Sequence, residues 1–243
     1  MLKEKIYFIV GTGTDIGKTF LVENLCRNFP SAMAIKPIAS GFKDDDENSD
    51  SAKILSAINN SQISLNVNPS LPKVDLELSV ELPSDRLKVT SKLDDISPWR
   101  FEEAVSPHFA AKNSGMEINF LDVKNFCQEK IALAKTNNQL LFIEAAGGVM
   151  TPINDEKTFL DLAADLKIPT LLVSANYLGS ISHTLCAVTA LKSRNVVIEK
   201  IIINEDLPTQ LPPSLSPNQT IENFSKIAVI SLKNLLANKA SPK

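Results

Sequence analysis

The segment IYFIVGTGTDIGKTFL, residues 6 to 21, constrains the fold more than any other part of the chain. A short apolar run rich in strand formers leads into a glycine-rich loop, and helical spacing of apolar residues follows from Gly17 to Phe29. This order is typical of a phosphate-binding loop, in which N–H groups at the start of a helix hold phosphate. Five residues separate Gly11 from Gly17, whereas the usual pattern has four. We therefore expect a phosphate site built on an unusually long loop.

The rest of the chain alternates strand-like and helix-like segments. AMAIKPIASG is interpreted as a second strand running into a loop, and further strands are predicted at LLFIE, TLLVSA, KIIIN and within KIAVIS. Helices are predicted to start at NSD and at SPH, and at about 121–136, 158–166 and 181–194. This rhythm predicts an α/β fold with a doubly wound, mostly parallel sheet and helices on both faces, in a single domain spanning 1–243. The proline-rich stretch 66–98 is read as an inserted hairpin or an irregular excursion.

Composition excludes several classes of function. With 243 residues, 44% hydrophobic residues and a net charge of −3, the chain suits one globular domain without a general basic surface. We therefore expect neither nucleic acid nor a membrane as a partner. Three widely spaced cysteines suggest no disulfide framework or cysteine metal site. The N-terminus lacks the pattern of a signal peptide, so the expected location is cytoplasmic.

Glycines mark the edge of the sheet where a ligand would bind. Seven of the eight lie in loops just after a predicted strand, among them Gly41, Gly147, Gly148 and Gly179. In an open α/β sheet, ligands bind outside the carboxyl ends of the strands. Several such loops converging on one edge indicate a ligand site there.

The residue types in these loops suit phosphate chemistry. Lys18 is expected to reach the outer phosphates, and the Thr19 hydroxyl to bind Mg²⁺. Glu144 at the end of a strand and Asp50 at a helix start supply the carboxylates that such a metal site uses. Lys36, which ends the second strand, points either to the site, where it would stabilise an anion, or to solvent.

Taken in order, these motifs resemble those of the dethiobiotin synthetases, ATP-dependent enzymes of biotin synthesis with a P-loop NTPase fold. GTGTDIGKT, KPIASG, NSD, SPHFAAKNSG, EAAGG, NYLGSISHT and IIIN carry the resemblance, which covers most of the chain. The family's own loop has the same five-residue spacing. A segment at about 69–97 has no counterpart in the family and is interpreted as an atypical insertion.

The resemblance implies a cyclo-ligase. One amine of diaminopelargonate (7,8-diaminononanoate) takes up CO₂, ATP phosphorylates the carbamate, and the second amine closes the cyclic urea and expels phosphate. It implies Mg²⁺ as cofactor, ATP as co-substrate and a homodimer, in which the neighbouring subunit's helix start holds the substrate carboxylate. The implied catalytic residues are Lys18 and Lys36, and the implied metal ligands are Thr19, Asp50 and Glu144. The implied ATP contacts are Asp15, Ile16, Gly17, Lys18, Thr19, Phe20, Asp50, Glu144, Ala145, Ala146, Gly147 and Asn204, and the implied substrate contacts are Thr14, Ser40, Leu178, Gly179, Ser180 and Ser182.

Some positions depart from the family pattern. Ala145 replaces a glycine, so we expect a methyl group where the backbone approaches the nucleotide, and Ser182 replaces an asparagine. Gly13 stands where an aspartate is frequent. The alternatives are a nucleotide-switch ATPase of the partition and cell-division type, a small-molecule kinase, or a family member that binds nucleotide without turnover. The switch ATPases carry an additional lysine early in the loop, which is absent from Gly11 to Gly13.

Overall fold

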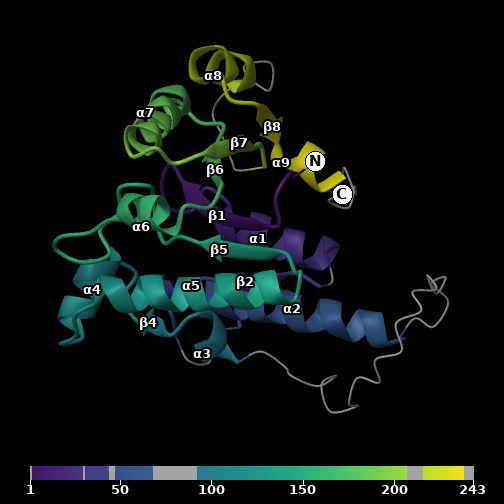
Figure 1. Cartoon of the computed structure of the whole chain (residues 1–243). Helices are drawn as coiled ribbons and strands as arrows, with labels where there is room; N and C mark the ends of the chain where they lie inside the picture. Colours follow the sequence, from purple (N-terminus) through teal and green to yellow (C-terminus); the bar gives the residue numbers. More distant parts are fainter. Residues whose placement is uncertain (1, 30, 44–46, 68–91, 207–215, 238–243) are drawn as a thin grey trace.

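A parallel sheet forms the centre of the molecule. The computed structural model describes residues 2–29, 31–43, 47–67, 92–206 and 216–237, with only the backbone of 61–67. Within these residues six strands are ordered β2-β5-β1-β6-β7-β8, and every neighbouring pair is parallel (Figure 1). Their bounds are β1 Ile6–Gly11, β2 Met33–Ile35, β5 Leu141–Glu144, β6 Thr170–Ala175, β7 Ile198–Asn204 and β8 Val229–Ser231.

The inner strands are rich in apolar residues because both of their faces are covered. Side chains alternate between the faces of a strand. In β1, Phe8 and Val10 therefore belong to one hydrophobic cluster, and Tyr7 and Ile9 to another on the opposite face. All six residues of β1 are buried. A continuous apolar run such as IYFIV is thus the expected signature of this position.

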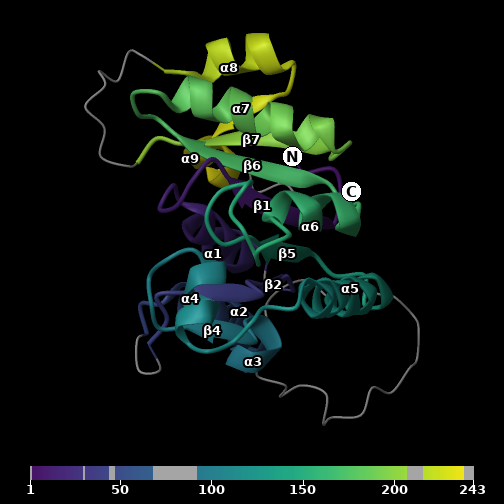
Figure 2. The same cartoon turned by 90° about the vertical axis from the view of Figure 1, so that its left-hand side faces the viewer.

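Helices cover both faces of the sheet (Figures 1 and 2), which confirms the predicted doubly wound α/β fold. One face packs against α1 (Lys18–Asn28), α2 (Asp50–Val67) and α9 (Leu232–Ala237). The other packs against α4 (Pro107–Asn113), α5 (Phe120–Thr136), α6 (Phe159–Leu166), α7 (Ser180–Ser193) and α8 (Asn218–Ser225). None of the helices in the described ranges has both the length and the apolar character needed to cross a membrane.

The connections make β1 the point at which the strand order reverses. From β1 the chain moves outward to β2, returns to β5 beside β1, and continues on the other side of β1 through β6, β7 and β8. Ligands in open α/β sheets bind at such a reversal, outside the carboxyl ends of the strands. The glycine-rich loop after β1 lies at this point.

The second predicted strand is divided into two. β2 ends at Ile35, and β3 (Ile38–Ser40) pairs with β4 (Trp99–Phe101) in a separate two-stranded sheet. Pro37 separates β2 from β3, and proline has no N–H to continue a ladder. The Lys36 N–H instead donates to the Ile96 carbonyl. The expectation of one strand running into a loop was therefore wrong at its second half.

Three further elements differ from the expectations. α8 begins within EDLPTQLPPSLSPNQT, residues 205–220, whose prolines predict a loop. The helix gave little sequence signal, because its eight residues are mostly polar and only Ile221 and Ser225 are buried. β4 and the short α3 (Leu93–Ile96) were also not predicted. Most of the segment interpreted as an insertion at 69–97, and the hairpin considered for it, lies outside the described residues.

Candidate active site

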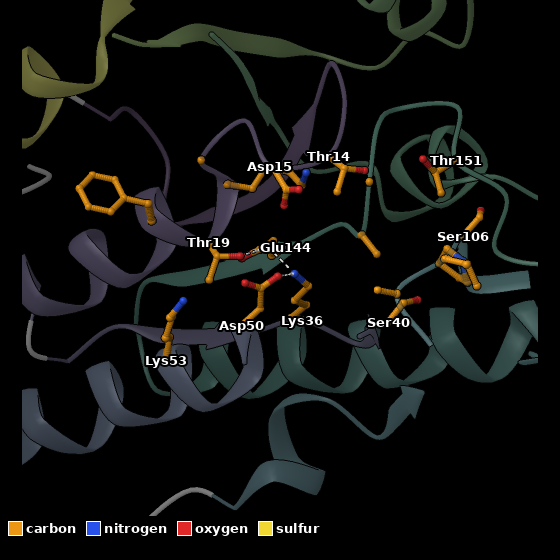
Figure 3. A pocket seen from close by; sticks show the side chains of 18 of the residues that line it. Thr14, Asp15, Thr19, Lys36, Ser40, Asp50, Lys53, Ser106, Glu144 and Thr151 are labelled. Atoms are coloured by element: carbon orange, nitrogen blue, oxygen red, sulfur yellow. Dashed lines mark hydrogen bonds and ion pairs between the residues drawn. The ribbon is translucent and has the colours of Figure 1, made fainter. Parts of the chain in front are cut away.

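A cavity of about 770 Å³ opens at the carboxyl edge of the sheet. The loop after β1, the starts of α1, α2 and α4, and the ends of β2, β3 and β5 all contribute to its walls (Figure 3). The lining residues are Thr14, Asp15, Gly17, Lys18, Thr19, Phe20, Glu23, Lys36, Ser40, Asp50, Lys53, Ala104, Val105, Ser106, Pro107, Glu144, Ala146, Gly147 and Thr151. Of the loops marked by glycines, those after β1 and β5 line this cavity and Ser40 lines it just before Gly41, whereas the loop with Gly179 contributes no lining residue.

The glycine-rich loop leaves the start of α1 open to the cavity. Gly17 adopts a left-handed conformation with φ of +99°, and a Cβ there would collide with the Asn204 Nδ2 atom. Only glycine suits both the conformation and this close approach. No side chain caps the first turn of α1. Its N–H groups are thus available to an anion, as at other helix N-termini.

Lys18 lies folded back along this loop. Its Nζ atom donates to the Gly13 carbonyl at 2.8 Å, and the side chain is buried. Burial is the largest influence on the pKa of Lys18 and lowers it. The negative charge of Glu144 opposes this effect only in part, so the pKa falls from 10.5 to about 8. A phosphate beside the ammonium group would favour its charged form.

Four side chains meet in the cavity: Thr19 from α1, Asp50 from α2, Glu144 from β5, and Lys36 from the link between β2 and β3. The Lys36 Nζ atom donates to Glu144 Oε1 at 2.9 Å and also to Asp50 Oδ2. The Thr19 hydroxyl donates to the same Glu144 oxygen at 2.6 Å. Lys36 is 6% exposed and Glu144 is fully buried. Of the two interpretations of Lys36, the structure places it in the site and not in solvent (Figure 3).

Electrostatic attraction within this cluster favours the charged forms of Lys36 and Asp50. Burial, the largest single influence, lowers the pKa of Lys36, but Glu144 and Asp50 together outweigh it and raise the pKa above its ordinary value. Burial likewise raises the pKa of Asp50, but Lys36 and a hydrogen bond with Thr19 outweigh it and lower the pKa. Lys36 is therefore a fixed positive charge at neutral pH.

The donor set around Glu144 fits Mg²⁺. Thr19, Asp50 and Glu144 offer one hydroxyl and two carboxylates, which are the hard oxygen ligands that this ion takes together with phosphate oxygens. The second carboxylate oxygen of Glu144, Oε2, is buried and has no hydrogen-bond partner. A buried carboxylate oxygen without a partner is costly unless a cation or a water occupies the space beside it. Within the described residues, no cluster of three or more His, Cys, Asp or Glu side chains offers another metal site.

The other end of the cavity is lined by small polar groups. The Ser40 hydroxyl is buried and has no partner among the described residues. The Ser106 hydroxyl pairs with His108 Nδ1 at 3.0 Å, and the Thr151 hydroxyl accepts from the Gly148 N–H at 2.8 Å. Figure 3 shows Ser40, Ser106 and Thr151 on one side of Lys36, and Thr19 on the other. Lys36 thus lies between two ends of one cavity.

Most of the residues predicted for the site line this cavity, but several do not. Ile16 and Ala145 are buried, and Ala145 belongs to the hydrophobic core, so its methyl group does not point at the cavity as expected. Asn204 lies against the loop instead, with its Nδ2 atom donating to the Ile16 carbonyl at 3.2 Å and its Oδ1 atom accepting from the Asp206 N–H at 3.1 Å. The predicted substrate contacts Leu178, Gly179, Ser180 and Ser182 at the start of α7 do not line it either.

Seven lining residues were not predicted. They are Glu23, Lys53, Ala104, Val105, Ser106, Pro107 and Thr151. Helical spacing could have identified two of them, because Lys53 follows Asp50 by three residues and Glu23 follows Thr19 by four. Ser106 and Pro107 were assigned only to a helix start, and the Ser106 side chain does not cap that helix. No local signal marks Thr151.

Both a family model and individual relatives match this chain over more than half of its length. Residues 72–232 match the model of a family described as an AAA domain. The ATP-dependent dethiobiotin synthetase BioD of Acidiphilium cryptum is 35% identical over 211 residues, which cover 85% of this chain and 82% of that protein. The protein of the same name from Phenylobacterium zucineum is 34% identical over 215 residues, which cover 85% of this chain and 78% of that one.

Among solved structures, the alignment with the MinD cell division protein of Aquifex aeolicus covers 97% of this chain and 85% of the MinD chain. The TM-score is 0.48 and the identity 15%. A likeness at this level does not bear on function.

Proposed function

Because the chain belongs to the ATP-dependent dethiobiotin synthetase family, we propose that it forms the cyclic urea of dethiobiotin from 7,8-diaminononanoate, CO₂ and ATP. The observation that carries the proposal is Lys36, a buried ammonium group between a phosphate-binding loop and a small polar pocket. A reaction that passes through a carbamate and a carbamic–phosphoric anhydride needs a positive charge at that position.

The two ends of the cavity correspond to the two substrates. ATP binds at the end formed by residues 15–20, where Lys18 and the open start of α1 hold its phosphates. The amines bind at the end formed by Thr14, Ser40 and the start of α4. The unpartnered Ser40 hydroxyl supports this assignment, because an amine or carbamate would supply the missing hydrogen bond. At the ATP end, Ala146, Gly147 and Asn204 are further proposed contacts of the nucleotide.

The residues of the chain act by orientation and charge. Carboxylation of one amine gives a carbamate, whose oxygen attacks the terminal phosphorus of ATP and releases ADP. The second amine then attacks the anhydride carbon, closes the ring and expels phosphate. Lys36 stabilises the carbamate and the phosphoryl group in turn, and Lys18 stabilises the charge on the transferred group. Neither lysine forms a covalent bond, so placement and electrostatic stabilisation supply the rate enhancement.

Thr19, Asp50 and Glu144 are the proposed ligands of Mg²⁺. The ion would neutralise phosphate charge and orient the terminal phosphoryl group for attack. The unpartnered Glu144 Oε2 atom supports this assignment.

The proposed assembly is a homodimer in which the start of α7 serves the partner's cavity. Residues 178–182 lie outside this chain's cavity, and Leu178 is 86% exposed beside Ile181, which is also exposed. Their helix N-terminus suits the carboxylate of the diamine. Light scattering that found a fully active monomer would contradict this arrangement.

The test is an assay of the purified protein with 7,8-diaminononanoate, bicarbonate, Mg²⁺ and ATP. Mass spectrometry is expected to find dethiobiotin, with one ADP formed per urea. ATP hydrolysis that ignores the diamine and yields no urea would overturn the proposal and would favour a nucleotide-switch ATPase.

ATP binding is expected to take up protons at alkaline pH. In the free protein the pKa of Lys18 is about 8, so above that pH the side chain is mostly neutral. Bound phosphate raises this pKa, so ATP affinity falls as the pH rises through about 8. Titration calorimetry at pH 8.5 in two buffers of different ionisation enthalpy measures the proton uptake. Lys18→Met should abolish it, and equal heats in both buffers for the unmodified protein would contradict the assignment.

A further inference from the structure

Lys53 lines the cavity but has no part in the chemistry described above. It lies on α2 three residues after Asp50, so both side chains project from the same face of the helix. The side chain is half-buried. Figure 3 shows it at the Thr19 end of the cavity, on the opposite side of Lys36 from Ser40, Ser106 and Thr151.

The side chains of Lys18 and Lys36 have partners, whereas the Lys53 ammonium group has none among the residues that the structure describes. Lys18 donates to the Gly13 carbonyl, and Lys36 is held by Asp50 and Glu144. The Lys53 ammonium group forms no hydrogen bond or ion pair with any residue that the structure describes, although the Lys53 backbone N–H donates to the Ser49 carbonyl within the helix. The charge of Lys53 acts on Asp50. Burial raises the pKa of Asp50, Lys36 lowers it, and Lys53 adds a smaller lowering effect.

The charge balance of the cavity makes this ammonium group important for a polyanion. Four carboxylates line the cavity, from Asp15, Glu23, Asp50 and Glu144, against three ammonium groups. Glu23 is engaged by Arg27, and Lys36 already serves two carboxylates. Of the three lining lysines, Lys53 is thus the one whose positive charge needs no rearrangement to meet an incoming phosphate.

We propose that Lys53 is a third phosphate-binding cation of the cavity, which contacts the phosphate chain of the bound nucleotide at the Thr19 end. The inference rests on the proposed function in one respect only, namely that the nucleotide binds in this cavity. Because Lys53 lies away from Ser40 and Ser106, it contributes to nucleotide affinity and leaves the diamine end unaffected.

The experiment is titration calorimetry of the full chain with ATP and with ADP in the presence of Mg²⁺. Lys53→Met is expected to weaken both nucleotides about three- to tenfold, the size of one charge-assisted contact that solvent partly screens. Lys53→Arg should restore most of the affinity. In turnover, the KM for ATP should rise in Lys53→Met by a similar factor, whereas kcat and the KM for the diamine should stay within about twofold.

Lys135→Met is the matched control, because Lys135 is an exposed lysine of α5 that does not line the cavity. It should bind nucleotide like the unmodified protein. Unchanged ATP affinity in Lys53→Met, an equal loss in the control, or a change confined to the diamine would overturn the proposal. Calorimetry measures nucleotide binding without turnover. A protein that binds nucleotide but makes no dethiobiotin would therefore disprove the proposed function, and the calorimetric comparison would still decide the role of Lys53.

Discussion

Lys36→Met is expected to lower kcat for dethiobiotin formation by about a hundredfold to a thousandfold, the usual effect of removing one preorganised donor from a developing anion. The effect should be this large because Lys36 is 6% exposed and stands between the two ends of the cavity. Water cannot replace its charge there. ATP affinity should change far less, because Lys18 and the start of α1 remain. Steady-state kinetics and calorimetry together measure the two effects.

The same substitution also affects the fold, so it needs a second variant. Without Lys36, the fully buried Glu144 loses its cation, and breaking such a buried pair typically destabilises a protein by about 3–5 kcal/mol. Lys36→Arg keeps the charge and should retain most of the stability, yet its planar head cannot place the charge where the ammonium group lies. We therefore expect both variants to be slow and only Lys36→Met to melt markedly earlier. A folded Lys36→Met protein with unchanged kcat would remove Lys36 from the mechanism.

Glu144→Gln is expected to raise the Mg²⁺ concentration needed for half-maximal ATP turnover by at least about tenfold, in the range seen when the surroundings of a metal site are altered. Glu144 combines a hydrogen bond from Thr19, the ion pair with Lys36 and a free buried oxygen, so one carboxylate organises three groups. The amide keeps the shape but supplies no charge. The pKa of Lys36 should fall as well, because burial then opposes its charge with only Asp50 remaining as a partner.

The measurement is a Mg²⁺ titration of turnover and of ATP binding at fixed total ATP. Asp94→Asn is a suitable control, since Asp94 is an exposed carboxylate that pairs with Arg100 outside the cavity. It should leave the Mg²⁺ requirement unchanged. An identical requirement in Glu144→Gln and the unmodified protein would exclude Glu144 as a metal ligand.

The contrast between Lys36 and Lys53 shows what could be predicted. KPIASG drew attention to Lys36 because it ends a strand and resembles a family motif, although sequence left its direction open. Lys53 belongs to no such motif, and helical spacing places it near Asp50 only once Asp50 is known to face the cavity. For Ala145 the sequence predicted a methyl group where the backbone approaches the nucleotide, and the structure shows that the side chain packs into the core.

By itself, the sequence determined the parallel α/β fold and the edge at which the site lies. Buried strands need continuous apolar runs, phosphate loops need glycine before a helix, and both signals are local. Only the tertiary structure decided that Lys36 bridges Asp50 and Glu144, that the Lys53 ammonium group has no partner among the described residues, and that Thr151 lines the cavity. These facts depend on distances between residues far apart in the chain, such as the 108 positions that separate Lys36 from Glu144. Such distances are set by how helices and strands pack, and no local pattern encodes them.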